Sequence, residues 1–357
     1  MPGRRLAGLD GWRAIAIILV VAHHLAASSG WEWSQTNLGV CISFTLSGFL
    51  ITWVLLEEEA ATGVISLKSF YQRRALRILP PVLTFLAITL ALAPLGLTDA
   101  TFRDTGWCLL FVRNLLGKAS ITTHFWSLSV EEQFYLLWPA MLIFAGKKAR
   151  LKVALTFLAL APLWRFVNNK WLGPPDLINQ RRFDLCFVPI LLGCTLALIR
   201  FDPKLIHYVR NRFVQSRAML VFSIALIIGL FHFGHGSVIG FVAIAVAINE
   251  SLDHSERWGG ILNSAPATWI AKRSYSIYIW QELFCLNSRV GWLSHFPQNV
   301  LATLAVASVS YHFIDAPLAR LRKRMKSKQA AELAPAGRCA EPSLSLIVAS
   351  QAVSAGD

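Results

Sequence analysis

Charged side chains are scarce in this chain of 357 residues: Asp, Glu, Lys and Arg make up only 15% of it, whereas 55% of the residues are hydrophobic. Soluble domains carry about 25% charged residues, so the composition excludes an ordinary soluble protein. The apolar residues gather in repeated runs of about 20, the length of a helix that crosses a bilayer. The sequence therefore predicts an all-α integral membrane protein.

Cysteine is also sparse, and the six cysteines show neither a C-x-x-C pair nor metal-type spacing. The pattern predicts no disulfide framework and no metal site. A cleavable signal sequence is lacking as well, because the first apolar run has no small-residue cleavage site and contains Arg13. We expect that run to be retained as a membrane span.

Ten membrane spans are predicted, with boundaries good to a few residues each. They cover residues 12–27, 38–56, 79–97, 126–145, 151–168, 183–199, 216–232, 236–250, 274–292 and 298–316. The remaining run at 107–116 is too short to cross and is expected to be re-entrant or interfacial. Residues 1–326 are then one transmembrane domain, and the Ala/Ser/Pro-rich residues 327–357 are predicted to be a disordered cytoplasmic tail.

The basic residues cluster in alternate loops. With a cytoplasmic N-terminus, 25 of the 34 Lys and Arg residues fall on the inner side and 7 on the outer side. Cytoplasmic loops are enriched in Lys and Arg, so both termini are expected in the cytoplasm and the protein in the inner (cytoplasmic) membrane as a multi-pass protein. This distribution also accounts for the net charge of +14, and no nucleic-acid partner is predicted.

The first span holds two ionisable residues, Arg13 and His24, eleven positions apart. Eleven residues turn a helix by about 1100°, so the two side chains share one face and are about 16 Å apart along the axis. Ionisable groups inside a membrane are costly and mark function by default. We expect Arg13 near the cytoplasmic face and His24 near the outer face.

The start of the fourth span carries two carboxylates, Glu131 and Glu132. From its distance to the end of the span, Glu131 is expected at the depth of His24, roughly 5–8 Å below the outer surface. A carboxylate beside a histidine is the usual arrangement of a general base. The alternative is that the carboxylates only favour the start of the helix, and for Glu132 this alternative stays open.

Two arginines, Arg74 and Arg77, precede the third span and share a helical face. Arginine forks suit phosphate and pyrophosphate groups. Simple anchoring on the cytoplasmic side explains them without any ligand, and the spacing alone favours that interpretation.

The outer ends of the fifth and sixth spans carry polar residues, Arg165, Arg182 and Asp184, and Trp126 begins the fourth span. Planar polar groups with aromatic rings are typical of sugar sites, so these four are candidates for substrate binding. An aromatic belt at the membrane interface is the simpler explanation for most tryptophans on this side.

Small residues in the second span, Ser47 and Gly48 within Phe44–Phe49, favour close helix packing. A catalytic serine there would need a base and an oxyanion hole nearby, which the sequence does not reveal.

Seven motifs in order resemble the acyltransferase-3 family of membrane O-acyltransferases, over about residues 6–320. They are Leu9-Asp-Gly-Trp-Arg13 through His24, Phe44-Thr-Leu-Ser-Gly-Phe49, Phe70-Tyr-Gln-Arg-Arg-Ala-Leu-Arg77, Trp126-Ser-Leu-Ser-Val-Glu131-Glu-Gln-Phe-Tyr135, Arg182-Phe-Asp184, Ser274-Tyr-Ser-Ile-Tyr-Ile-Trp280 and Tyr311-His-Phe-Ile-Asp-Ala-Pro317. Each motif alone is weak, and their order makes the resemblance specific.

The resemblance implies a ten-helix domain that moves an acyl group, usually acetyl, from cytoplasmic acyl-CoA to a carbohydrate hydroxyl outside. The Arg-x10-His motif of the family falls on Arg13 and His24, its arginine pair on Arg74 and Arg77, and its acidic residue on Glu131. On this hypothesis His24 is the base, Glu131 orients it, and the three arginines bind acyl-CoA. We expect no permanently bound cofactor.

Two positions depart from the family pattern. Gln281 stands where histidine is common, which puts a proton-transfer role there in doubt, and Asp315 stands where glutamate is common. The length of the chain resembles the stand-alone type without an added hydrolase-like domain.

The acceptor is expected to be a surface glycan, such as lipopolysaccharide or exopolysaccharide, or a lipid-linked oligosaccharide, with membrane lipid around the protein. The alternative function is a non-enzymatic transporter or flippase of lipid-linked sugars, since intramembrane ionisable groups suit proton-coupled transport too. That class often shows repeated halves with broken spans, and no internal repeat is apparent here.

Overall fold

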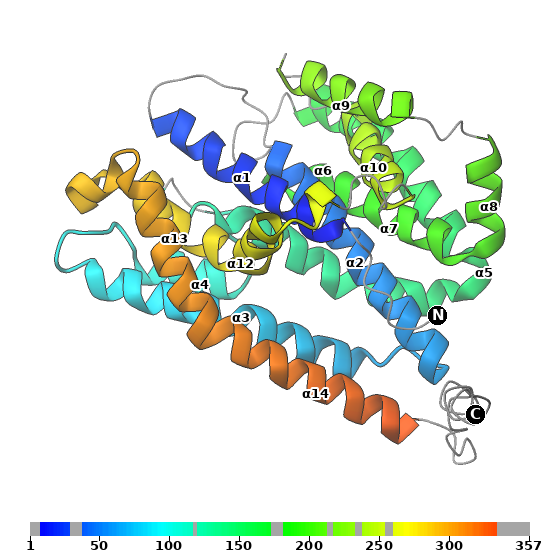
Figure 1. The fold of residues 1–357 in the computed structure, drawn as a ribbon, viewed down its shortest axis with the longest axis horizontal. Coiled ribbons are helices and arrows are strands. Elements are labelled where there is room, and N and C mark those ends of the chain that lie inside the picture. The colour runs from blue at the N-terminus through cyan, green and yellow to red at the C-terminus, as the bar shows by residue number, and fades with distance from the viewer. Residues whose placement is uncertain are drawn as a thin grey trace, which may run out of the picture.

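The computed structural model describes residues 8–28, 38–116, 120–172, 181–212, 217–232, 238–253 and 260–333. Within these ranges every regular element is helical, as predicted (Figure 1). The α-helices are α1 (Leu9–Ser28), α2 (Leu38–Thr62), α3 (Leu67–Leu92), α4 (Phe102–Leu109), α5 (Phe125–Leu172), α6 (Phe183–Cys186), α7 (Val188–Phe201), α8 (Pro203–Arg212), α9 (Arg217–His232), α10 (Val238–Asp253), α12 (Ala265–Cys285), α13 (Gln298–Ser310) and α14 (Ala316–Leu333).

Five helical segments in the described part of the chain are long and apolar enough to cross a membrane. They are Leu9–Ala26, Leu38–Thr62, Leu67–Leu92, Phe125–Trp171 and Gln298–Ser327, and Val188–Phe201 and Val221–Leu230 are shorter apolar helices. These segments support a multi-pass helical membrane protein. The count of ten spans and the side of each terminus stay predictions.

Several helix boundaries differ from the predicted spans. The predicted spans at 126–145 and 151–168 are the two halves of α5, which meet at Gly146, where a positive φ of 62° interrupts the helix and favours glycine. Helix α12 ends at Cys285, short of the predicted end at residue 292, and a 3₁₀ helix, Ser288–Ser294, follows it.

The arginine-rich segment before the third predicted span is itself helical. Helix α3 begins at Leu67, where the Ser66 hydroxyl accepts a hydrogen bond from the Ser69 backbone N–H and caps the helix. Hydropathy places the span later because the first turns of α3 are polar.

At the other end of the chain α14 stays helical to Leu333, and residues 334–357 of the predicted tail lie outside the described residues.

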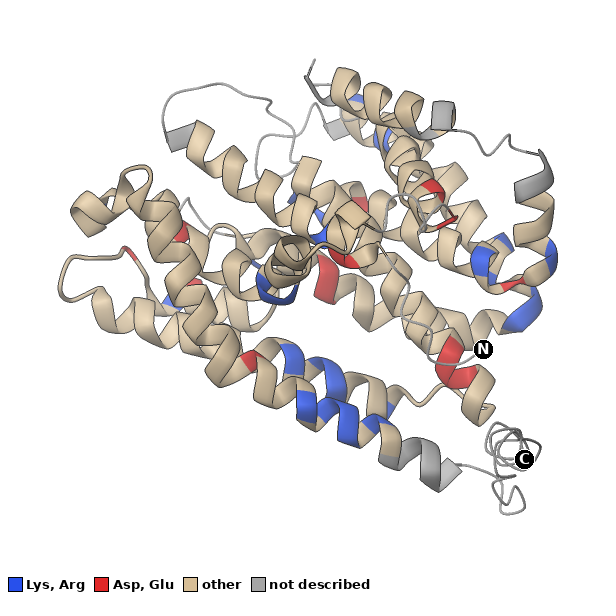
Figure 2. Cartoon of the chain, in the orientation of Figure 1, with Lys and Arg blue, Asp and Glu red and all other residues tan. Residues whose placement is uncertain are grey.

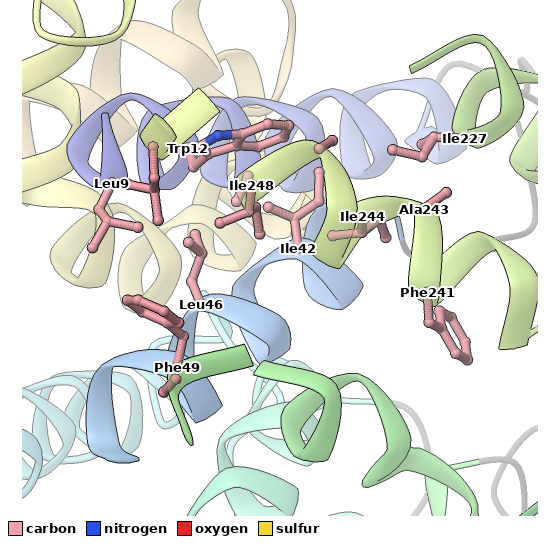
Figure 3. Packing of buried hydrophobic residues seen from close by; sticks show 14 of the residues in the cluster. Leu9, Trp12, Ile42, Leu46, Phe49, Ile227, Phe241, Ala243, Ile244 and Ile248 are labelled. Carbon is pink, nitrogen blue, oxygen red and sulfur yellow. The ribbon is translucent and has the colours of Figure 1, made fainter. Parts of the chain in front are cut away.

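Helices α1, α2, α7 and α10 pack around one core. Leu9 and Trp12 of α1 lie over apolar side chains of α2, with Ile248 of α10 beside them (Figure 3). Helix α2 crosses α7 with backbone contact, since a Cβ atom at Gly48 would stand 1.8 Å from the Ile190 carbonyl oxygen. The close approach predicted from the small residues of this segment is confirmed, and it fixes α2 as one wall of the cavity described below.

Helices α3 and α14 run side by side, and they carry many of the Lys and Arg residues (Figures 1 and 2). A π-helix, Tyr311–Asp315, immediately precedes α14. Such π-bulges occur frequently at functional sites. Two segments that are far apart in the sequence thus place their basic side chains close together.

Candidate functional site

A cavity of about 530 Å³ lies among α1, α2, α3, α5, α12 and α14. Its middle is apolar, with Ile17 and Val20 of α1 and Phe44 and Ile51 of α2 in the wall. Seven cationic side chains line it: Arg13, Arg73, Arg74, Arg77, Arg322, Lys323 and Lys326. A cavity of this size, largely apolar with a concentration of positive charge, suits an elongated ligand with an anionic portion.

Glu131 and Glu132 both face Arg74. The Arg74 Nη2 atom lies 2.7 Å from Glu132 Oε1 and 3.9 Å from Glu131 Oε2. The guanidinium also stacks over the Tyr135 ring, 3.5 Å from its centre, a cation–π contact. Tyr135 in turn donates to Glu131 Oε2 at 3.4 Å and hydrogen-bonds Ser47. Arg74 is thus held in place by protein groups on several sides.

Three other cavity cations have acidic partners. Arg73 pairs with Glu58 at 2.6 Å, Arg13 with Asp10 at 3.7 Å, and Lys326 with Glu57 at 3.8 Å. The Arg13 pair lies within one turn of α1. Arg13 therefore reaches the cavity from the first turns of α1, at the same end as the arginines of α3.

A second polar cluster lies one helical turn beyond the cavity. On α1, His24 follows the lining residue Val20 by one turn, and on α12, Glu282 follows the lining residue Tyr278 by one turn. His124 stands just before the first residue of α5, three residues before the lining residue Ser127. His24 and Glu282, on two helices that line the cavity, and His124, at the start of a third, thus stand just past lining residues.

His124 and Glu282 form the centre of this cluster. The Nδ1 atom of His124 lies 3.0 Å from Glu282 Oε2, and each of the two residues is only 3% exposed. The rings of His124 and Tyr278 pack edge to face with their centres 5.3 Å apart. Tyr278 donates to the His124 carbonyl oxygen, and its hydroxyl lies 2.9 Å from that of Ser127. The cavity wall and the histidine cluster are therefore directly connected.

His24 belongs to the same cluster. Glu282, His124 and His23 are its electrostatic neighbours, and the Gln281 side chain lies beside its ring. Its Nδ1 atom and both amide atoms of Gln281 are buried without a hydrogen-bond partner among the described residues. Buried polar atoms normally find partners, and exceptions of this kind are typical of sites that meet a ligand.

The structure does not bring Glu131 to His24. The carboxylate beside the two histidines is Glu282, while Glu131 lies two turns along α5 from His124 and faces Arg74. The sequence analysis estimated the depths of Glu131 and His24 in the membrane on the assumption that the outer ends of their helices lie at the same level. They do not, since α1 continues for a further turn past His24 whereas His124 lies just before the first residue of α5.

Of the residues predicted for sugar binding, two are in direct contact. Arg182 and Asp184 form an ion pair at 2.8 Å, and Asp184 also accepts from the Trp164 indole N–H. Arg165 follows Trp164 on α5 and is exposed, and both Arg165 and Asp184 are electrostatic neighbours of Cys186. Trp126 lies beneath the guanidinium of Arg181, at 5.5 Å. The structure thus joins Arg182 to Asp184 and shows no contact between this pair and Arg165 or Trp126 among the described residues.

Sequence reasoning missed His124 and Glu282. Glu282 lies inside the predicted span 274–292, so the rule that drew attention to Arg13 and His24, an ionisable group within an apolar run, would have found it. His124 stands just outside a predicted span and gives no such signal. Among the described residues no group of three His, Cys, Asp or Glu side chains is suited to hold a metal ion.

Comparison with known proteins gives a consistent result. Residues 6–314 match the sequence model of the acyltransferase-3 family, described as an acyltransferase domain. The chain is 27% identical over 361 residues to the peptidoglycan O-acetyltransferase OatA of Listeria monocytogenes, covering 87% of this chain and 55% of that protein. It is 29% identical over 361 residues to the O-acetyltransferase OatA of Staphylococcus aureus, covering 88% of this chain and 57% of that protein.

The chain therefore spans just over half the length of these curated relatives. No solved structure gives a significant match. The family match nevertheless extends from the first turns of α1 to the π-helix before α14 and includes both polar clusters. The chain belongs to the acyltransferase-3 family.

Proposed function

We propose that this protein is a membrane O-acyltransferase that moves an acyl group, acetyl first among them, from cytoplasmic acyl-CoA to a hydroxyl of an extracytoplasmic carbohydrate. The observation that supports this function best is the cavity, which extends from the arginines of α3 to Ser127 and Tyr278 beside the histidine cluster. The ten helical segments are proposed to cross the inner membrane with both termini in the cytoplasm, as the loop charges indicate.

Arg77 of α3, next to Arg74 in the cavity wall, is proposed to bind the phosphates of the donor. Guanidinium and ammonium groups pair with phosphate through charge-assisted hydrogen bonds. The apolar part of the cavity suits the pantetheine chain, and Arg13 is proposed to contact that chain. Arg74 and Glu131 form the wall around this chain, because Arg74 is already engaged with Glu132 and Tyr135.

The transfer step is proposed at the histidine cluster. His24 takes the proton of the acceptor hydroxyl, the hydroxyl oxygen attacks the thioester carbonyl carbon, and the carbon–sulfur bond breaks. The proton then passes from His24 to the departing thiolate, so the products are the O-acyl sugar and CoA. Glu282 stabilises the transient imidazolium, since an opposite charge nearby favours the charged ring.

The acceptor is proposed to be a cell-surface glycan. The names of the two relatives refer to O-acetylation, and in one case to peptidoglycan, so a peptidoglycan fragment is the first acceptor to test, with lipopolysaccharide and exopolysaccharide as the others. The Arg182–Asp184 pair, Arg165 and Trp126 stay predictions for the acceptor side.

The test uses the full chain, purified and reconstituted in liposomes with labelled acetyl-CoA and each glycan. We expect label on the glycan, and a loss of at least about 100-fold with His24→Asn, because general base catalysis contributes 10²–10⁴-fold. His23→Asn is the matched control, since its side chain points about 100° away on α1. Glycan that moves across the membrane without label would instead identify a transporter and contradict the proposal.

A further inference from the structure

Three cations of the cavity, Arg77, Arg322 and Lys323, form no ion pair with another described residue, whereas Arg13, Arg73, Arg74 and Lys326 each have a carboxylate partner. Arg77 comes from α3, and the other two come from α14. They gather where the two helices run side by side (Figure 2). The unpaired positive charge of the cavity is therefore concentrated at this junction.

The local charges leave the junction positive. Arg322 lies within electrostatic range of both Arg74 and Arg77. The carboxylate of Asp315, which Ser276 hydrogen-bonds, is near Arg77 and Arg322, and its single negative charge offsets only part of the positive charge of Arg77, Arg322 and Lys323. Like charges held this close repel one another. A bound anion removes that repulsion, and arginine forks on two helices match the oxygens of a phosphate group.

We infer that Arg77, Arg322 and Lys323 form a phosphate-binding site between α3 and α14, which takes the phosphate groups of the nucleotide part of acyl-CoA. This inference rests on the proposed function and deepens it, because it adds α14 to the donor site. Helix α14 begins after the last residue of the family match, so the inference about its basic residues rests on their place in the cavity.

The alternative source of phosphate is a lipid headgroup, since basic residues next to a membrane attract anionic lipid. The arrangement on α14 favours the cavity. Lys326 lies about 40° around the helix from Arg322, whereas Arg320 and Arg324 lie about 160° on either side of it. Only Arg322, Lys323 and Lys326 of these residues line the cavity, and Arg322 is partly buried there. Attraction to anionic lipid alone would not require these three basic residues to line the cavity.

The experiment measures CoA binding by titration calorimetry on the full chain in nanodiscs, with Arg322→Gln/Lys323→Gln as the variant. Arg320→Gln/Arg324→Gln is the control, because it removes the same charge from the opposite face of the same helix. We expect the variant to weaken the Kd for CoA by at least about tenfold, the loss typical of a charged hydrogen bond, and the control to leave it unchanged.

Two further arms separate the sources of phosphate. In discs of neutral phosphatidylcholine, the variant must still bind CoA more weakly than the wild type does. In the second arm, the wild type must bind 3′-dephospho-CoA more weakly than CoA, and the difference between these two Kd values must be smaller in the variant. A variant effect seen only in discs with anionic lipid would assign the residues to lipid and overturn the inference.

Failure of the inference is distinguishable from failure of the proposed function. If the wild type transfers label from acetyl-CoA and the variant keeps the wild-type Kd, the function stands and the site on α14 is wrong. If the wild type neither binds CoA nor transfers label, the proposed function fails and the inference fails with it.

Discussion

The two polar clusters, one around Arg74 on α3 and one around His24 on α1, differ in how completely their groups are paired. At the arginine end, Arg74 meets Glu132, Glu131 and the Tyr135 ring, and Arg73 meets Glu58. At the histidine end, atoms of His24 and Gln281 are buried with no hydrogen-bond partner among the described residues. Arg73 and Arg74 are thus paired within the protein, whereas these atoms of His24 and Gln281 are not.

This difference indicates that the arginine cluster contributes mainly to stability and the histidine cluster mainly to the reaction. An unsatisfied buried polar atom costs about 1–3 kcal/mol, so the histidine end lowers the stability of the fold. Residues retained at such a cost are candidates for a role in the reaction. The arginine end stabilises the packing of α3 against α5, and substitutions there are expected to affect folding first. The following predictions test this division.

The largest effect is expected at Glu282. We expect Glu282→Gln to lower the kcat of acetyl transfer by at least about 100-fold, because the amide has the same shape but does not stabilise a charged histidine. The KM for acetyl-CoA should stay unchanged, since Glu282 does not line the cavity. Steady-state kinetics in liposomes measure both values.

Glu250→Gln provides the control for Glu282. Glu250 is also a buried glutamate in an apolar helix, 4% exposed, but it lies on α10 away from the cavity. We expect this variant to keep the wild-type kcat. A Glu282→Gln enzyme with wild-type kcat would show that the histidine end has no part in transfer.

The second effect concerns stability and the Arg74–Glu132 pair. Arg74→Gln leaves the Glu132 carboxylate without its partner. The two side chains are 16% and 13% exposed, so the cost lies between the value of about 1 kcal/mol for an exposed pair and that of about 3–5 kcal/mol for a buried one. We expect a large fall in the free energy of unfolding, and a partial recovery in the double variant Arg74→Gln/Glu132→Gln, because no isolated charge then remains.

Unfolding by denaturant in detergent micelles measures this double-mutant cycle. A stable Arg74→Gln variant whose only defect is a raised KM for acetyl-CoA would contradict the structural role. It would restore the simpler prediction that Arg74 binds donor phosphate directly.

The sequence predicted the helical class and the positions of most helices because long apolar runs depend on composition within one segment. It also placed Arg13 and His24 on one face of α1, since helical geometry alone decides that. The partner of His24 depends on how far α1 extends relative to α5, which is a property of packing between helices. Glu131 was therefore assigned to His24, whereas the structure places it at Arg74.

The basic residues of α14 illustrate the same limit. Arg322 and Lys323 read as ordinary cytoplasmic anchors in the sequence, because positive charge after a last span is expected. Only the contact between α14 and α3 brings them to Arg77 and the cavity. Long-range juxtaposition of this kind leaves no local pattern in the chain.

The smallest effect is expected at the outer pair, Arg182 and Asp184. Their side chains are 28% and 32% exposed, and exposed ion pairs contribute about 0–1 kcal/mol. The double variant Arg182→Gln/Asp184→Asn should therefore unfold within about 1 kcal/mol of the wild type. If these residues bind the acceptor, the double variant raises the KM for the glycan severalfold and leaves kcat and the KM for acetyl-CoA unchanged. The control variant, Lys170→Gln on α5, is expected to change none of these three values. An unchanged glycan KM would restrict the pair to packing and would move the acceptor site toward Trp126 and Arg181, which lie nearer to Glu282.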